Sequence, residues 1–165
     1  MTAIKIERLT PEAFAPFGRV LTIPEGVPSG ADRPDLDVWM EISDLMGLEQ
    51  QEPVLTFLKC KRHTLPVNKI ERHNRTAEAF IPLEGESVLL VAPCSDPTDP
   101  NAKPDESQLR AFLLDGSMGV FLPRGSWHWA PFPLQDAATF ILLFDKHITD
   151  DIEIHDIGPH TLQLY

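Results

Sequence analysis

The sequence has few cysteines, an excess of acidic over basic residues, and no long apolar run. Two cysteines, Cys60 and Cys94, do not make a disulfide framework for a chain of 165 residues. Lys and Arg number 14 against 25 Asp and Glu, a net charge of −11. That charge argues against a nucleic-acid partner and against an anionic membrane surface. It does not exclude a small anionic substrate, because salt screens a distant acidic surface from a few local cations.

Apolar runs are short throughout the chain. Residues 88–92, among the longest of them, fall far below the roughly 20 apolar residues of a membrane-spanning helix. The first ten residues, MTAIKIERLT, alternate apolar and charged side chains, unlike a signal peptide. We therefore expect no membrane association and a cytoplasmic location.

The chain's length and its 42% of apolar residues suit a single domain over residues 1–165. Sixteen Pro and nine Gly interrupt it at short intervals, which favours many short strands over long helices. Thr10, Pro11 and Gly18 are typical of the cap, the first position and the end of one short helix. We expect strands at residues 4–9, 19–23, 54–60, 67–73, 78–82, 88–92, 109–114, 120–122 and 139–145.

The remaining segments carry weaker patterns. Residues 24–37 are typical of a loop, and residues 38–48 of a strand followed by a weak helical turn. The proline-rich residues 93–107 predict a mobile loop, and the acidic residues 145–156 a solvated C-terminal segment. The pattern as a whole predicts an all-β sandwich or barrel with a short N-terminal helix.

One stretch carries residues suited to chemistry. Glu71 and His73 are two apart, so on a strand they project from the same face. If residues 74–77 turn the chain, the next strand can return Glu78 to that face. A second stretch places a Pro-x-Gly turn, Pro123 to Gly125, ahead of His128. Such a turn can deliver this histidine to the same cavity from a distant strand.

The same residues could have structural roles instead of catalytic or metal-binding ones. Glu71 and His73 could be polar residues on a solvated sheet face, and His128 a hydrogen-bonded core histidine. Glu78 precedes an apolar run, and its unpaired burial would be costly, so it needs a metal, a cation or a proton. We expect Trp127 and Trp129 to pack in the wall or an interface. The other histidines lie in polar or terminal segments and are expected at the surface: His63, His147, His155 and His160.

Both stretches resemble the two motifs of the cupin superfamily. Glu71-x-His73, four residues, Glu78, six residues and Gly85 follow the first motif, with Glu71 where most metal-binding cupins have histidine. Gly119, three residues, Pro123-x-Gly125, two residues and His128 follow the second with a shorter first gap. The resemblance implies a cupin-like β-barrel or jelly roll.

The chain is more specifically similar to the ureidoglycolate lyase family, also labelled ureidoglycolate hydrolase. The similar runs are Glu71-Arg72-His73, Ala79 to Leu83, Leu109 to Phe112, Arg124-x-x-Trp127-His128, and the opening from Leu9 to Val20. The resemblance implies a homodimer that splits ureidoglycolate into glyoxylate and urea in allantoin breakdown, with an associated divalent metal such as nickel. Three departures concern the substrate more than the fold. The family often has Gln at the position of Glu78 and His at that of Trp129, and its Asn-Asn-Gly segment has no counterpart here.

The expected chemistry needs a base for the substrate hydroxyl, an acid for the leaving nitrogen, and a partner for the carboxylate. A metal bound by His73 and His128 with Glu78 or Glu71 could be Ni, Mn, Fe or Zn. Without metal, Glu71 or Glu78 could be the base, because burial raises the pKa of a carboxyl group. The candidates for binding the carboxylate are Arg72, Lys59, Lys69 and Arg110, although strand parity turns Arg72 away from Glu71.

Two rival functions remain. One is a different cupin-fold enzyme, such as a lyase, isomerase or dioxygenase acting on another small acid. The other is a non-catalytic module that binds a small acid and is stabilised by it. Release of glyoxylate and urea separates both from a ureidoglycolate lyase.

Overall fold

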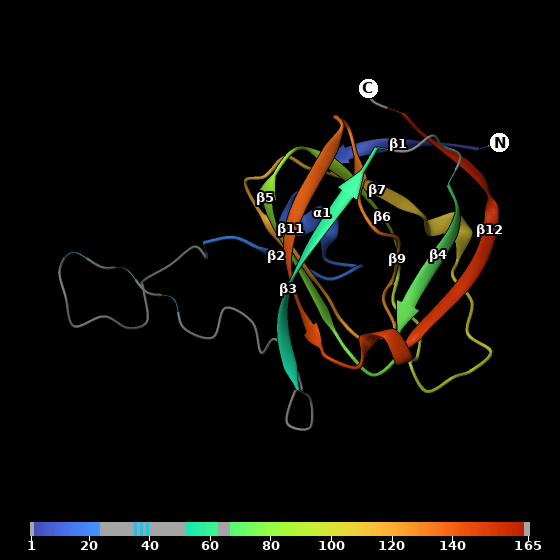
Figure 1. The fold of residues 1–165 in the computed structure, drawn as a ribbon. Coiled ribbons are helices and arrows are strands. Elements are labelled where there is room, and N and C mark those ends of the chain that lie inside the picture. Colours follow the sequence, from blue (N-terminus) through green and yellow to red (C-terminus); the bar gives the residue numbers. More distant parts are fainter. Residues whose placement is uncertain are drawn as a thin grey trace.

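Figure 1 shows the computed structural model of the protein, which describes residues 2–23, 35, 37, 39, 52–62 and 67–163. These residues form a seven-stranded and a five-stranded sheet. Their helices are short: α1 (Pro11–Phe14), and the 3-10 turns η1 (Glu106–Gln108) and η2 (Ile148–Asp150). The predicted all-β class with a short N-terminal helix is confirmed. No helix in the described residues has the length and apolar character needed to cross a membrane.

The larger sheet curls until it meets itself. Its strands in spatial order are β10 (Phe132–Pro133), β6 (Ser87–Ala92), β7 (Arg110–Leu114), β1 (Thr2–Arg8), β12 (Ile152–Gln163), β4 (Val67–His73) and β9 (Trp127–His128). Because β9 also pairs with β6, the six strands from β6 to β9 close into a ring, on the right in Figure 1. One face of this ring carries an apolar cluster that includes Ile6, Ile70, Leu90, Ala111 and Trp127.

The smaller sheet packs against the other face of the ring. Its strands in order are β2 (Arg19–Leu21), β8 (Gly119–Leu122), β5 (Glu78–Glu84), β11 (Ala137–Asp145) and β3 (Pro53–Lys61). A second apolar cluster joins the two sheets, with Leu89 and Phe112 from the ring and Phe80 and Phe140 from the smaller sheet. The strands β4, β5 and β9, which carry the motif residues, therefore meet where the two sheets face each other.

Helix α1 begins as its sequence predicts and ends early. The hydroxyl of Thr10 accepts a hydrogen bond from the Ala13 amide at 3.2 Å, and Pro11 begins the helix. Phe14 is fully buried and packs edge-on against Phe112 at 5.2 Å between ring centroids. The chain then leaves the helix in turns, and the Gly18 amide donates to the Phe14 carbonyl at 3.2 Å.

The C-terminal segment is the main correction to the predicted elements. Residues 145–156 are half-buried or exposed, as expected, but β12, which begins at Ile152 and pairs with both β1 and β4, was not predicted. The burial of β12 alternates over its first residues, and this period of two is the signal that its acidic composition obscured. His160, expected at the surface, is only 7% exposed. Strands β9 and β10 are also additions to the prediction.

The other predicted strands and histidines agree with the structure to different degrees, and some of them lie outside the described residues. Strand β4 has the predicted bounds, and the remaining predicted strands are shifted by a few residues at their ends. His147 is exposed as expected, and His155 is half-buried against the Trp127 ring. The predictions for residues 24–37 and 38–48, and for His63, lie outside the described residues or rest on them only in isolated positions.

Candidate functional site

Four predicted residues converge between the two sheets. Glu71 on β4 lies directly opposite His128 on β9, so these two side chains share a face. The His128 Nε2 atom lies 3.1 Å from Glu78 Oε2, and the His73 Nε2 atom 3.8 Å from the same oxygen. His73, Glu78 and His128 are 5%, 6% and 2% exposed, whereas Glu71 is half-buried. The residues form a mostly buried cluster with Glu71 toward the exterior.

The Pro-x-Gly turn has a defined backbone role. Gly125 has φ +78°, which L side chains rarely adopt, and a Cβ there would lie 2.3 Å from the Ser95 carbonyl oxygen. The Gly125 amide donates to the His73 carbonyl at 2.7 Å. The turn is therefore fixed to the end of β4, and His128 follows three residues later on β9.

The hydrogen bonds of both histidines determine their tautomers. His73 Nδ1 lies 3.1 Å from the Asp151 carbonyl oxygen, and His128 Nδ1 lies 3.1 Å from the Ser126 carbonyl oxygen. Because a carbonyl only accepts, each Nδ1 carries a proton and each neutral ring has its lone pair on Nε2. A neutral His128 would then face the Glu78 carboxylate with two acceptors 3.1 Å apart. That contact requires a proton or a cation.

The electrostatic environment shifts the pKa values of the site groups in different directions. Burial alone would lower the pKa of His128, but its hydrogen bond to Glu78 and the Glu78 and Glu71 charges raise it above the usual range. Burial lowers the pKa of His73, and the charge of His128 lowers it further. Burial raises the pKa of Glu71, and the Glu78 charge adds to this, while His128 opposes it. Opposed shifts in neighbouring groups are typical of acid–base sites.

The donor set fits a divalent metal ion. Ligand atoms of Glu71, His73 and His128 all lie within 4.8 Å of one another. With both Nδ1–H groups bound to backbone carbonyls, both Nε2 atoms have a lone pair that a metal can use, the arrangement usual for metal-ligating histidine. Imidazole with carboxylate suits borderline metals, which agrees with the candidates predicted from sequence.

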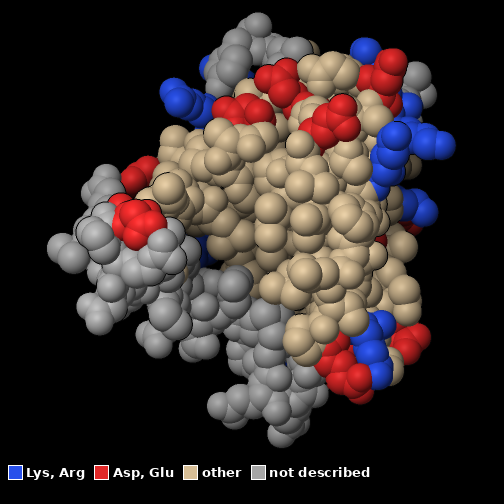
Figure 2. All heavy atoms as spheres, turned by 60° about the vertical axis from the view of Figure 1, so that its left-hand side comes forward, with Lys and Arg blue, Asp and Glu red and all other residues tan. Residues whose placement is uncertain are grey.

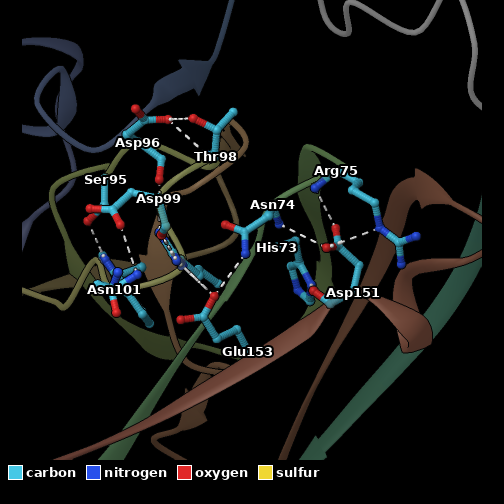
Figure 3. Close-up of polar contacts among 12 residues, drawn as sticks. His73, Asn74, Arg75, Ser95, Asp96, Thr98, Asp99, Asn101, Asp151 and Glu153 are labelled. Atoms are coloured by element: carbon cyan, nitrogen blue, oxygen red, sulfur yellow. Dashed lines mark hydrogen bonds and ion pairs between the residues drawn. The ribbon is translucent and has the colours of Figure 1, made fainter.

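A second layer of acidic residues surrounds the turn between β4 and β5, as Figure 3 shows. The Asp151 carboxylate accepts from the backbone amides of Asn74, Arg75 and Thr76. Glu153 Oε2 accepts from the Asn74 side-chain amide at 2.8 Å. Neither acid was predicted as part of the site, because both lie in the segment that was expected to be solvated.

Arg72 lies away from the site. Its side chain is fully buried on the opposite face of β4, with the guanidinium carbon 4.8 Å from the centre of the Trp127 ring. Its donors are bound to Glu153 Oε2 at 2.9 Å and to the carbonyls of Asp96 and Asp99 at 3.2 and 2.9 Å. These bonds fix part of the loop that was expected to be mobile.

The other three candidate cations are also placed apart from the four site residues. Arg110 binds Glu7 and the Ala13 carbonyl, which joins β7 to β1 and α1. Lys59 is exposed on β3 beside a surface hollow of about 650 Å³. Lys69 is exposed on β4, two residues from Glu71 and on its face by strand parity. Of the four, Lys69 alone combines exposure with the face of the site.

The fold and the cluster define a β-barrel protein with a buried histidine–carboxylate centre suited to acid–base or metal-assisted chemistry. A family model described as ureidoglycolate lyase matches residues 1–163. The chain is 26% identical over 161 residues to a ureidoglycolate lyase from Salmonella typhimurium strain LT2, covering 96% of this chain and 97% of that protein. A ureidoglycolate lyase from Escherichia coli O9:H4 strain HS is 27% identical with the same coverage. The chain belongs to the ureidoglycolate lyase family, and its enzyme class is that of a lyase.

Proposed function

We propose that this single-domain chain cleaves ureidoglycolate to glyoxylate and urea at the cluster formed by Glu71, His73, Glu78 and His128. The observation that carries the proposal is the position of Glu78, whose Oε2 lies 3.1 Å from His128 Nε2 and 3.8 Å from His73 Nε2. Family membership supplies the substrate, because the relatives carry the name ureidoglycolate lyase.

The proton transfers fall to Glu78. Its carboxylate takes the proton of the substrate hydroxyl as the oxygen becomes the carbonyl of glyoxylate and the carbon–nitrogen bond breaks. The same group then gives the proton to the departing nitrogen, which completes neutral urea. General acid–base help of this kind contributes about 10²- to 10⁴-fold to a rate. In the metal-free chain, the hydrogen bond to His128 Nε2 keeps this carboxylate in place.

A divalent metal is part of the proposal. Glu71, His73 and His128 would bind it, and when bound it would polarise the substrate oxygens as a Lewis acid. Elemental analysis of the purified protein tests this, together with a Glu71→Gln variant. Loss of bound metal in that variant, with the fold intact, is the expected result. Unchanged metal content would remove Glu71 from the ligand set.

Lys69 is our choice for the substrate carboxylate. It is exposed and about 6–7 Å along β4 from Glu71, on the same face. An ammonium group there can neutralise the carboxylate without entering the buried cluster. Lys69→Met should raise KM more than it lowers kcat, with Lys59→Met on β3 as the matched control. Equal behaviour of the two variants would reject Lys69.

The decisive experiment follows glyoxylate and urea separately after addition of ureidoglycolate. Wild-type protein should release both in equal amounts, and Glu78→Gln should release neither while remaining folded. Near-normal rates in Glu78→Gln would contradict the proposed site.

A second candidate is an enzyme of the same fold acting on a small acid with an apolar substituent. Ile154 lies opposite Glu71 and Ile152 opposite His73, and they are 52% and 46% exposed, so apolar side chains adjoin the site on its own face. A panel of small acids separates this candidate from the first. Turnover of an apolar-substituted acid without action on ureidoglycolate would favour it.

The proposal includes a homodimer formed through the outer face of the smaller sheet. Leu55 and Phe57 on β3 and Ile81 and Leu83 on β5 are 71%, 76%, 39% and 53% exposed. Figure 2, which brings this side forward, shows a broad area without acidic or basic side chains. In a chain of net charge −11, such an area suits a second copy, because it brings no carboxylates together.

Sedimentation of wild type and Phe57→Glu tests the dimer. Wild type should sediment as a dimer and the variant as a folded monomer. A variant that remains dimeric would show that the interface does not include this face of the smaller sheet. We also propose a cytoplasmic location, which suits the two free thiols of Cys60 and Cys94.

A further inference from the structure

Asp151, immediately before β12, contacts the site in two ways. Its carboxylate, with a side chain 8% exposed, binds three successive backbone amides of the β4–β5 turn. Oδ1 accepts from Asn74 at 3.1 Å, and Oδ2 accepts from Arg75 at 2.7 Å and from Thr76 at 3.1 Å. Its backbone carbonyl accepts the Nδ1–H of His73 at 3.1 Å. One residue therefore binds both a site histidine and the turn that follows it.

The β4–β5 turn matters because a site residue lies at each of its ends. It spans the few residues between His73, which ends β4, and Glu78, which begins β5. A displacement of the turn would move both side chains relative to His128, which enters from β9. Successive amides directed at one carboxylate form an anion-binding concavity, and in this structure the anion belongs to the chain itself.

We propose that Asp151 is a positioning residue, which fixes the tautomer and orientation of His73 and the placement of Glu78. The inference rests on the proposed function for its kinetic consequence, but its structural consequence can be measured without turnover. Asp151 acts through the other residues and makes no contact with the substrate.

The surrounding contacts show why Asp151 and not its neighbours has this role. Glu153 reaches the turn through the Asn74 side chain and is otherwise bound to Arg72. It has no contact with His73 among those described. Asp150, one residue earlier, has an exposed side chain, and among the contacts of the described residues it reaches the turn through its backbone carbonyl alone, as an acceptor for Arg75. Asp150→Asn is thus a control that removes the same charge from the adjacent position.

Asp151→Asn tests the proposal in the full-length chain. The asparagine keeps one acceptor oxygen but directs an NH₂ group at backbone amides that need an acceptor. We expect kcat for ureidoglycolate to fall about 10- to 100-fold, as for other outer residues that orient metal-ligating histidine, with a smaller change in KM. Affinity for added Ni²⁺, measured by calorimetry, should fall by a similar factor. Asp150→Asn should match wild type in both measurements.

The readout that a merely structural role would not move is the tautomer of His73. Nitrogen-15 NMR of the metal-free chain should show a single Nδ1–H tautomer in wild type and in Asp150→Asn. Asp151→Asn keeps the main-chain carbonyl that accepts from His73 Nδ1–H, but release of the turn should displace this carbonyl, so the variant should show a mixture of the two tautomers. Unchanged tautomer, Ni²⁺ affinity and kcat in folded Asp151→Asn would overturn the proposal.

The outcomes separate this inference from the proposed function. If wild type does not act on ureidoglycolate but Asp151→Asn changes the His73 tautomer, the function fails and the positioning role stands. If Asp151→Asn does not fold, Asp151→Glu serves instead: it keeps the charge but moves the carboxylate one methylene out of register with the three amides, so the His73 tautomer and the Ni²⁺ affinity should still change. A wild-type tautomer and wild-type Ni²⁺ affinity in that variant would overturn the proposal in the same way.

Discussion

The two faces of β4 use ionisable residues in opposite ways. On one face Glu71 and His73 join Glu78 and His128, with two carboxylates and two imidazoles in a small volume. On the other face a single guanidinium, that of Arg72, is bound to Glu153 and to two loop carbonyls. Three consecutive residues of one strand therefore belong to two different environments.

The difference lies in how completely each charge is satisfied. Arg72 stacks on Trp127, and its donors end on acceptors that remain acceptors at any pH near neutrality. On the site face the pKa of His128 is raised and that of His73 is lowered, and the centroids of the two rings lie 5.3 Å apart. Satisfied buried charge stabilises a fold, whereas competing buried charge is typical of a site that moves protons or binds a cation.

The largest effect should come from breaking the site face. His128→Ala removes the partner of Glu78, and the turnover of ureidoglycolate should fall about 10²- to 10⁴-fold. The circular dichroism spectrum should remain that of the wild type, because backbone pairing with β4 and β6 holds β9 in the ring and the substitution leaves that pairing in place. A variant that keeps near-normal kcat would show that the competing charges of this face are not catalytic.

A substitution on the Arg72 face of β4 should have the opposite effect, a loss of stability with little change in kcat. Arg72→Met removes the guanidinium and leaves Glu153 with fewer donors, so the free energy of unfolding should fall by about 1.5–3 kcal/mol, the range for hydrogen bonds to charged groups. Urea denaturation measures this loss. kcat per folded molecule should change far less than in His128→Ala.

Arg72→Lys sharpens the same comparison. The ammonium group keeps the charge but loses the planar fork and the stacking on Trp127. We expect stability between those of wild type and Arg72→Met. A kcat loss in Arg72→Met as large as in His128→Ala would mean that the two faces are not separable.

The contrast also explains what could be predicted from the sequence. Glu71 and His73 were identifiable because strand parity fixes their common face, and β4 was predicted with its observed bounds. Arg72 was turned from the site by the same parity. Asp151 could not be found this way, because its contacts are with backbone amides and through its own carbonyl. No side-chain spacing encodes such contacts.

The sheet order was equally out of reach. The ring closes through β9, which has two residues, and through β12, whose alternation was hidden among acidic residues and interrupted by Gly158 and Pro159. Period-two patterns identify long half-buried strands best, and they do not determine which strands pair at long range. The closure therefore appears only in three dimensions.

The smallest effect is expected at the ion pair between Glu7 and Arg110. Both side chains are partly exposed, unlike the buried groups on the two faces of β4. The hydrogen bond and charge of Arg110 lower the pKa of Glu7, while burial opposes them. A carboxyl group whose pKa is lower in the folded state adds stability at pH above its unfolded pKa. It loses that stability as the pH falls through its folded pKa.

Glu7→Gln should therefore lower the free energy of unfolding at about pH 7 by roughly 0.2–1 kcal/mol, because solvent screens a pair this exposed. The difference from wild type should shrink at an acid pH below the lowered folded pKa of Glu7, where this carboxyl group takes up a proton in both states. Urea denaturation of the two proteins at both pH values measures it. A difference that stays constant with pH would mean that Glu7 contributes packing and not charge.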